Sequence, residues 1–499
     1  MNSRNLLCTN VGWLAAVGVA LSGCPTNPTT DAAVPDAASP DTFAGNDAFA
    51  GSDAGLLDAH GDAGPFIPPI TMPLPHRVAA SAMGHDRYYG VVFDDESGFY
   101  VTGQVQDGTA ATDDVRTVVA HFTASGELDP AFGTGGFYVN NFSVGTSGEV
   151  ARGIALQSDG KILIGLTLEH AGASDARDRD LAVARLLPNG TLDPSFGTAG
   201  VALLDLSPGL LDGTTYRADG AWGLAVDATD RVLVSGLQVR SGQLDTDFAV
   251  VRLTPSGARD TTFSGDGVFS LDIGETSPTA RGVTVAPDGS IFSGGYYTPT
   301  GSTVVTAVAF KLDTNGALVA AFGGGDGIYA EAVLPIQTEI YAIGLQGSNL
   351  VTSGYGRATG TTNDFVSLRI NGTTGVRDTT YGGRGYALLD SGWPLGDNAR
   401  DLVVLPDNRV MLLGQLRGPV TTDAAMGDQD AALWMLTPDG QPDTSFDSDG
   451  VLTANFGGFA DHFWAGATDP RSGRVVVVGI ATAFPVTNDD GAVYLFSSR

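Results

Sequence analysis

The feature that most constrains the fold is a segment that recurs along the chain. DLAVARLLPNGTLDPSFGTAGVALLDL at Asp180–Leu206 returns as DFAVVRLTPSGARDTTFSGDGVFSLDI from Asp247 and, more loosely, as DAALWMLTPDGQPDTSFDSDGVLTANF from Asp430. Each copy reads as a strand, a tight turn, an Asp-x-x-Phe corner and a second strand. Repetition at this spacing predicts an array of similar units, each of which buries its apolar face against its neighbours.

Four strand signals make up one unit. A first strand of alternating small and large residues, as in Gly153–Leu156, is followed by a Pro-Asp-Gly type of turn and a second strand such as Lys161–Gly165. The third strand recurs seven times, but the corner and the fourth strand recur six times. The corner aromatics stand 59 to 67 residues apart, at Phe132, Phe196, Phe263, Phe322, Tyr381 and Phe446. We therefore expect an all-β fold with one four-stranded unit per period.

The seventh third strand has no corner or fourth strand after it, and this difference indicates how the array closes. The chain stops just after the seventh third strand, and an extended segment, Phe66–Ala80, precedes the first unit. We predict a seven-bladed β-propeller of four-stranded antiparallel blades over residues 66–499, in which Phe66–Ala80 supplies the missing fourth strand of the last blade. Its prolines are tolerated only on an outer edge strand. The alternative is an open stack of the same units, which would leave two unpaired sheet edges.

Three of these patterns together, D-x-A-V-x-R-L, P-x-G-x-L-D-x-S-F-G and x-D-G-K-I-L, resemble the delta-60 repeat family of large bacterial surface proteins. The resemblance covers about Tyr88–Arg499 and is best in Asp159–Leu206. The fourth unit departs from the pattern, because Leu318–Phe322 lacks the corner Asp, and the fifth lacks the Pro-Asp-Gly turn at Gln346–Asn349. The resemblance implies a repeat-built β domain, and it brings no catalytic motif.

The composition agrees with short strands and excludes one class of partner. The chain of 499 residues has 49 Asp against 7 Glu, two Lys against 24 Arg, 69 Gly and 25 Pro. Asp, Gly and Pro favour turns, whereas Glu and Lys are good helix formers. The net charge of -30 argues against nucleic acid as a partner, because phosphate binding needs a basic surface. We expect a monomer with an extracytoplasmic, anionic surface.

The N-terminus has the pattern of a lipoprotein signal peptide at residues 1–23. A basic residue, Arg4, and the short apolar run Leu14–Leu21 precede Leu21-Ser22-Gly23-Cys24, which resembles a bacterial lipobox. In such a box the Cys24 thiol carries the lipid and becomes the mature N-terminus, so Cys8 is removed and the folded part holds no disulfide. The alternative is an ordinary secretory signal with an incidental Cys.

The next segment, residues 24–65, is predicted to be a disordered tether. It consists mainly of Ala, Asp, Pro, Thr and Gly and has no Lys or Arg, so it cannot bury enough apolar surface to offset its ordering entropy. Such a tether gives an average reach of roughly 35 Å from the membrane. Pro25 in place of Asp after the lipidated Cys favours the outer membrane by resemblance to lipoprotein sorting rules. We therefore expect a lipid-anchored protein of the cell envelope.

The search for catalytic and metal motifs gives few candidates. The six His residues do not pair at i, i+4 spacing or approach a Cys, and no nucleophile elbow, P-loop or H-E-x-x-H occurs. We predict no catalytic residue, zinc site or cofactor. The glycine clusters Gly323–Gly327 and Gly382–Gly385 are interpreted as turns that need positive φ rather than phosphate loops.

Calcium is the one metal that stays open as an alternative. Acidic pairs occur at Asp447-Ser448-Asp449, Asp245-Thr246-Asp247 and Asp428-Gln429-Asp430, and calcium takes oxygen ligands. No stretch matches the twelve-residue calcium loop. An Asp also recurs just before the third strand, at Asp180, Asp247, Asp364, Asp430 and Asp490. A recurring Asp at a strand entry more often makes a side-chain bond to the backbone of a turn.

Loop lengths point to one face as the place where a ligand binds. The connections from second to third strands, such as Glu169–Arg179, and from fourth strands to the next unit, such as Gly392–Asn398, vary in length, and both emerge on the same face of an up-and-down blade. Aromatic residues and Arg occupy the position just before each first strand: Tyr89, Arg152, Trp222, Arg281, Tyr341, Arg400 and Trp464. We predict that these seven residues form a rim that stacks a sugar ring and holds an anion. The alternative is that they pack between neighbouring blades.

Two functions follow from this organisation. The first is a surface-anchored binding or scaffold module that recognises a glycan, peptide or protein through the variable face. The second is an extracytoplasmic propeller enzyme, a hydrolase or lyase that acts on polysaccharide. A cluster of carboxylates with Arg or His at the centre would favour the enzyme, and an aromatic face without perturbed carboxylates would favour binding.

Overall fold

The structure is a computed structural model that describes residues 84–106, 108, 113–143, 149–169, 179–207, 219–239, 245–274, 278–418, 429–455, 460–482 and 489–497. The predicted signal peptide, Cys24, the predicted tether and Phe66–Ala80 lie outside these residues. Within them, no helix has the length and apolar character needed to cross a membrane.

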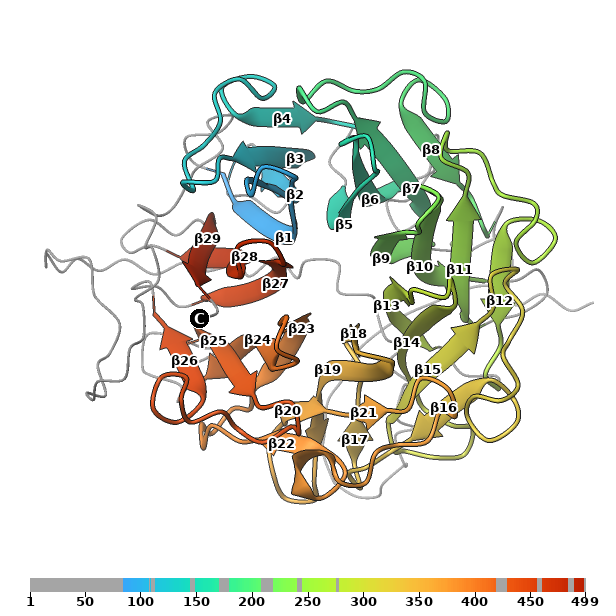
Figure 1. The fold of residues 1–499 in the computed structure, drawn as a ribbon, viewed down its shortest axis with the longest axis vertical. Coiled ribbons are helices and arrows are strands. Elements are labelled where there is room, and N and C mark those ends of the chain that lie inside the picture. Colours follow the sequence, from blue (N-terminus) through green and yellow to red (C-terminus); the bar gives the residue numbers. More distant parts are fainter. Residues whose placement is uncertain are drawn as a thin grey trace, which may run out of the picture. The chain divides into compact units, whose positions relative to one another are not determined.

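The described residues form seven antiparallel sheets that follow one another around a central axis, as Figure 1 shows. The innermost strands of successive sheets pack against each other, and the first inner strand, β1 (Asp86–Phe93), packs against the last, β27 (His462–Asp469). The ring is therefore closed, and the prediction of a seven-bladed β-propeller is confirmed.

The first four blades each have four strands in sequence order, from the axis outwards. Their further strands are β2 (Phe99–Gln106), β3 (Val115–Phe122) and β4 (Phe137–Asn140) in blade 1; β5 (Val150–Leu156), β6 (Ile162–Glu169), β7 (Arg179–Leu186) and β8 (Val201–Leu204) in blade 2; β9 (Gly220–Val226), β10 (Val232–Gln238), β11 (Asp247–Leu253) and β12 (Val268–Leu271) in blade 3; and β13 (Thr279–Val285), β14 (Ile291–Tyr297), β15 (Thr306–Leu312) and β16 (Ile328–Glu331) in blade 4.

Blades 5 and 7 differ from this plan, whereas blade 6 follows it. Blade 5 contains β17 (Gln337–Thr338), β18 (Ala342–Gln346), β19 (Asn349–Arg357), β20 (Asp364–Ser367), β21 (Arg369–Ile370) and β22 (Ala387–Leu389), with a 3-10 turn at Tyr381–Gly383. Blade 6 contains β23 (Asn398–Val404), β24 (Val410–Arg417), β25 (Gln429–Leu436) and β26 (Val451–Ala454), and blade 7 contains β27, β28 (Arg474–Thr482) and β29 (Asp489–Ser497). In blade 5 the first and third strands are each split in two. Blade 7 shows three strands among the described residues. Phe66–Ala80, the segment predicted to supply a fourth strand, lies outside those residues, so that strand stays a prediction.

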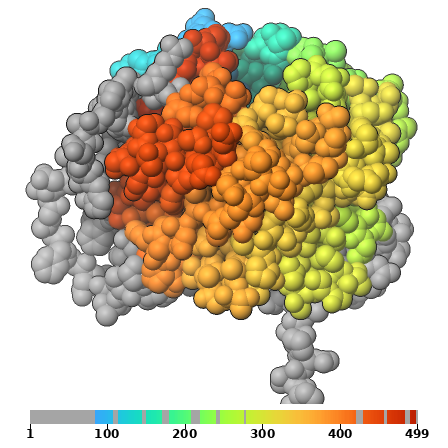
Figure 2. All heavy atoms as spheres, turned by 60° about the horizontal axis from the view of Figure 1, so that its bottom comes forward, coloured from blue at the N-terminus to red at the C-terminus, as the bar shows by residue number. Residues whose placement is uncertain are grey.

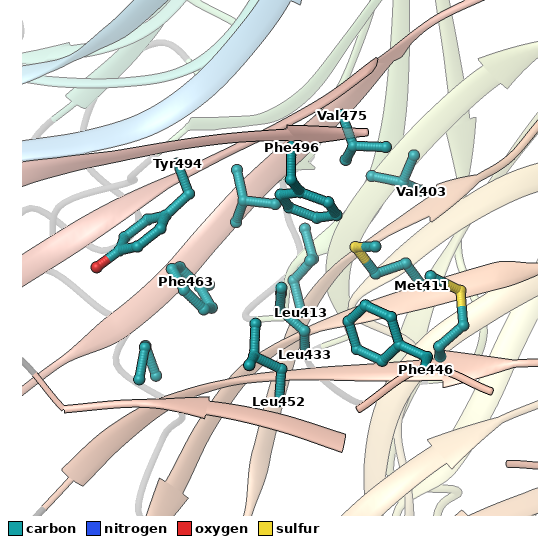
Figure 3. Packing of buried hydrophobic residues seen from close by; sticks show 14 of the residues in the cluster. Val403, Met411, Leu413, Leu433, Phe446, Leu452, Phe463, Val475, Tyr494 and Phe496 are labelled. Carbon is teal, nitrogen blue, oxygen red and sulfur yellow. The ribbon is translucent and has the colours of Figure 1, made fainter. Parts of the chain in front are cut away.

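The hydrophobic core lies between neighbouring blades rather than inside one blade. Between blades 6 and 7, Met411 and Leu413 of β24 and Phe446 of the corner pack in one cluster with Phe463 of β27 and Val475 of β28 (Figure 3). Because a strand sends alternate side chains to opposite faces of its sheet, each blade can present one apolar face to the preceding blade and another to the following blade. The outer sides of blades 4 to 6 accordingly follow one another without a break in Figure 2.

The repeated Arg and Asp of the sequence motif join one blade to the next. Arg252 of β11 donates from Nε to Asp260 at 2.8 Å and from Nη1 to the carbonyl oxygen of Thr314 in blade 4 at 2.5 Å, and its guanidinium lies 4.6 Å from the ring centre of Phe263. The same arrangement recurs in other blades as Arg185 with Asp193 and Phe196, and as Arg369 with Asp378 and Tyr381. In blade 4, which lacks the corner Asp, Lys311 takes the place of the Arg and donates to the carbonyl oxygen of Gly372 at 2.8 Å.

The backbone of the corner adds a second latch. In five blades, the residue after the corner aromatic donates its N–H to a carbonyl oxygen in the turn of the next blade. The pairs are Gly133 to Asn189, Gly197 to Ser256, Ser264 to Asn315, Gly323 to Thr374 and Gly382 to Asp439, at 2.8 to 3.0 Å. The glycine clusters at these corners have positive φ, for example 93° at Gly324 and 77° at Gly383. Their interpretation as turns is confirmed.

Candidate functional site

The seven predicted rim residues occupy one structural position in the seven blades. In six blades the pairing of the first strand with the second skips one residue, and this bulged residue is the predicted one: Tyr89, Arg152, Trp222, Arg281, Arg400 and Trp464. In blade 5, Tyr341 lies in the break between β17 and β18. A bulge leaves the extra residue outside the regular alternation and re-aims its side chain. We call these seven residues the axial ring.

From Arg152 around to Tyr89, the side chains of the axial ring contact one another in turn. Arg281 stands between two aromatic rings, 4.2 Å from the ring centre of Trp222 and 4.0 Å from that of Tyr341. Arg152 lies on Trp222 at 4.0 Å. On the other side, Arg400 lies 5.4 Å from Tyr341 and 4.5 Å from Trp464, and Trp464 meets Tyr89 edge-on at 5.1 Å. Cations over aromatic faces are attracted by the ring quadrupole.

The structure therefore brings all seven residues together, and each one contacts its equivalent in a neighbouring blade. These contacts are the packing between neighbouring blades that the sequence offered as the alternative, and the ligand-binding rim stays a prediction. Arg281 is the most buried member at 7% exposure; its Nη2 donates to the hydroxyl oxygens of Tyr341 and Tyr296 at 2.8 and 3.0 Å. The Nε of Arg281 and the Nε1 of Trp464 have no hydrogen-bond partner among the described residues.

A second set of polar residues lies two positions before the ring residues, and the sequence did not single it out. Arg87, Glu339 and His462 stand there in blades 1, 5 and 7, whereas blades 2 and 3 have Val150 and Gly220. The titratable members thus lie in blades 5, 7 and 1, which we call the titratable sector. Because the side chain at this position differs from blade to blade, no repeat pattern could have revealed it.

Glu339 is the carboxylate of this sector. It is 5% exposed, and its Oε1 accepts a hydrogen bond from Nε2 of Gln337 at 2.6 Å. Burial raises the pKa of Glu339 to about 7, against the opposing effects of Arg281 and of a hydrogen bond from Tyr355. The hydroxyls of Tyr355 and Tyr341 are 3.1 Å apart. A carboxyl group with a pKa near neutrality can both give and take a proton.

His462 stands beside the other end of the ring. Its Nε2 is 2.7 Å from Oε1 of Gln429, and its ring centre is 6.2 Å from that of Trp464. Burial, reinforced by the positive charge of Arg400, lowers the pKa of His462 to about 3. The imidazole is therefore neutral at physiological pH, so the positive charge of the ring comes from Arg side chains.

Three groups of carboxylates lie on the same face as the axial ring, at the starts of third strands and in the connections that follow fourth strands. They are Asp180, Asp205 and Asp219; Asp245, Asp247 and Asp272; and Asp364, Asp390 and Asp397, and within each group the ligand oxygens lie within 4.8 Å of one another. Burial and the neighbouring carboxylates raise the pKa of Asp364 to about 7. Burial raises the pKa of Asp219 to about 7 and that of Asp397 to about 6.

The acidic pairs that the sequence offered as calcium ligands lie in different surroundings in the structure. Asp245 and Asp247 do belong to a carboxylate group, whereas Asp449 accepts the N–H of Val451 at 3.0 Å, as a turn residue does. Asp428 lies outside the described residues. The expected turn bond of the strand-entry Asp is wrong for Asp364, whose side chain accepts no hydrogen bond from the described residues. The carboxylate instead faces Asp390 and Asp397.

Comparison with known proteins supports the fold. A profile of the family described as "Domain of unknown function (DUF5122) beta-propeller" matches residues 157–196 and 230–263, in blades 2 and 3. The match supports a propeller repeat family. No curated protein matches the sequence.

Solved structures with a similar chain path are distant. The polysaccharide lyase Uly1 is 9% identical with a TM-score of 0.44, over 84% of this chain and 91% of that chain. The β-propeller domain of the Trilobed protease from Pyrococcus furiosus is 10% identical with a TM-score of 0.42, over 84% and 95%. A glucose dehydrogenase is 14% identical with a TM-score of 0.34, over 66% and 93%. At these scores the likenesses carry no argument about function.

Proposed function

We propose that this protein is a lipid-anchored, extracytoplasmic binding module of the delta-60 type, and that its axial ring recognises an acidic glycan. The observation that carries the proposal is the unbroken stacking of Arg152, Arg281 and Arg400 with aromatic residues from neighbouring blades. Aromatic faces stack on sugar rings, and planar guanidinium groups bind carboxylates through paired hydrogen bonds.

Electrostatics support an anionic ligand. The whole chain carries a charge of -30, yet three Arg side chains, Arg152, Arg281 and Arg400, gather at the axial ring. The attraction would be local, because charges beyond about 10 Å are largely screened at physiological salt. An acidic saccharide supplies both the flat apolar face and the negative charge that the ring offers.

A glycan array tests this proposal with the chain from Pro25 onwards. We expect binding to acidic glycans and weaker binding to neutral ones. Arg281→Lys keeps the charge but loses the planar stack between Trp222 and Tyr341, so affinity should fall about tenfold or more, which corresponds to about 1.4 kcal/mol. Arg259→Ala, on an exposed turn, is the matched control and should bind like the wild type. Equal binding by Arg281→Lys would contradict the proposal.

The lipid anchor is tested separately. We expect that the full-length protein incorporates a labelled fatty acid and sediments with membranes, and that Cys24→Ser abolishes both. Cys8→Ser should behave like the wild type, because Cys8 lies in the predicted leader. A soluble protein that Cys24→Ser leaves unchanged would favour an ordinary secretory signal.

A polysaccharide hydrolase or lyase is the second candidate, and Glu339 is the observation that favours it. Its carboxyl group, with a pKa raised to about 7, lies near Arg281 and Tyr355, a combination that can move a proton beside a bound anion. A cluster of carboxylates at the centre of the ring would favour an enzyme, and Glu339 supplies a single one. If a bound acidic polysaccharide is cleaved, Glu339→Gln should abolish turnover and keep binding. Binding without turnover would leave the binding module as the function.

A further inference from the structure

We infer that Asp364, Asp390 and Asp397 form a binding site for a divalent cation of the calcium type where blade 5 passes into blade 6. Asp364 begins β20, Asp390 directly follows β22, and Asp397 directly precedes β23. The three residues are separated in sequence, but their ligand oxygens lie within 4.8 Å of one another. Hard cations such as Ca²⁺ are bound by sets of carboxylate oxygens of this kind.

The strand register shows that the group is a defined position in the blade. Phe365 pairs with Leu389, so Asp364 and Asp390 are the next residues along two paired strands. Asp397 is fixed by its backbone N–H, which donates to the carbonyl oxygen of Asn363 at 2.7 Å. The backbone thus holds three carboxylates around one point.

The side chain of Asp364 supplies the observation that points to a ligand. It is 5% exposed and accepts no hydrogen bond from the described residues. By contrast, Asp390 accepts from the N–H of Gly392 at 2.7 Å, and Asp397 accepts from the N–H and hydroxyl of Ser391 at 3.1 and 2.8 Å. A carboxylate that has no hydrogen-bond donor and faces two other carboxylates is repelled by them unless a positive charge compensates it. A cation between the three oxygens supplies that charge.

Blade 6 shows how the same position is satisfied without a cation. There Asp430 takes the place of Asp364, and Asn455 takes the place of Asp390, because Ala431 pairs with Ala454. The amide nitrogen of Asn455 donates to Oδ1 of Asp430 at 2.9 Å. In blade 6, the amide donor of Asn455 therefore compensates the carboxylate of Asp430. In blade 5, the carboxylate of Asp390 stands at the position of that amide and brings a third negative charge instead of a donor. Carboxylates also gather in blades 2 and 3, around Asp180 and Asp247.

A cation bound at this site would link Asp397, just before β23, to the two carboxylates of blade 5. Asp397 stands three residues before Arg400 of the axial ring, so a cation bound there would hold the backbone that carries this Arg. The inference does not depend on what the axial ring binds.

Calorimetric titration of the intact, chelator-treated protein with Ca²⁺ tests the inference. We expect saturable binding and a rise of the melting temperature with Ca²⁺, because a ligand that binds the folded state stabilises it. Asp390→Asn reproduces the Asp–Asn pair of blade 6, so it should fold, and it should bind one equivalent of Ca²⁺ less than the wild type. Its melting temperature without Ca²⁺ should equal or exceed that of the wild type.

The matched control is Asp407→Asn, which removes an exposed carboxylate at a turn of blade 6 and should leave the stoichiometry unchanged. The inference is overturned if the wild type shows no saturable Ca²⁺ binding, or if Asp390→Asn binds as many equivalents as the wild type. Glycan binding is measured in parallel. A loss of glycan binding with unchanged Ca²⁺ binding would affect the proposed function alone.

Discussion

At the scale of single residues, the axial ring shows what one repeat position can encode. The sequence places Tyr89, Arg152, Trp222, Arg281, Tyr341, Arg400 and Trp464 at equivalent positions, and the β-bulges explain why a side chain there leaves the core. Glu339 and His462 could not be predicted, because the position that they share is Arg, Val, Gly, Thr or Asn in the other blades. Their importance depends on contacts between blades, which no single repeat contains.

Gly257 tests the packing of one blade on the next. A Cβ at Gly257, where φ is +88°, would stand 2.8 Å from the backbone N of Gly197 in blade 2. Gly265 has a φ of +90° and no atom within 4 Å of its Cβ position. Both alanine variants carry similar backbone strain, but Gly257→Ala also forces the latch apart, so it should lose about 1–3 kcal/mol more. Urea unfolding measures the difference, and equal losses would contradict the latch.

At the scale of elements, the motif residues of the sequence serve contacts between blades. The Asp-x-x-Phe corner was predicted as a turn, and it is one, but its repeated Arg and its backbone N–H reach the next blade. Sequence periodicity predicts the strands because each strand repeats a local pattern. The direction of Arg185 or Arg252 towards a turn of the next blade depends on ring geometry, so it could not be predicted from one unit.

An ion pair contributes to the junction of the first and last blades. Arg87 of β1 donates from Nε to Asp489 of β29 at 2.7 Å, and its Nη2 lies 2.5 Å from the same oxygen. Asp489 is largely buried, and the positive charge of Arg87 outweighs burial and lowers the pKa of Asp489.

Removing that carboxylate should weaken the closure of the ring. Asp489→Asn leaves Arg87 partly buried without its counter-ion, so the free energy of unfolding should fall by about 2–4 kcal/mol. Asp407→Asn breaks the exposed pair with Arg409, and the expected loss is below about 1 kcal/mol. Denaturant unfolding compares the two variants. Similar losses would mean that the junction is held by other contacts.

At the scale of the whole molecule, stability should follow the buried carboxylates rather than the net charge alone. Burial raises the pKa of Glu149 and of Glu339 to about 7 from an ordinary value of 4.5, and that of Asp401 to about 6. The folded protein therefore holds protons that the unfolded chain releases at lower pH. The stability that this provides is fully present below the unfolded pKa and is lost as the pH rises through the folded pKa.

We therefore expect the free energy of unfolding to fall as the pH rises from about 5 to about 8 at constant ionic strength. Glu339→Gln stays neutral and should reduce this fall by about 2–3 kcal/mol, since one pKa unit corresponds to about 1.4 kcal/mol. Glu96→Gln, on an exposed turn, is the control. A wild-type stability that rises up to pH 8, or a Glu339→Gln profile parallel to that of the control, would contradict these assignments.

Tryptophan fluorescence reports on a ligand site at the axial ring, because Trp222 and Trp464 belong to it. Titration with an acidic oligosaccharide that the wild type binds should change the emission of Trp222 and Trp464 in a saturable way. Trp464→Phe should reduce that change and weaken binding, whereas Trp434→Phe, between blades 5 and 6, should reproduce the wild-type titration. An unchanged titration for Trp464→Phe, or ligand binding without any change in emission, would contradict a site at the axial ring.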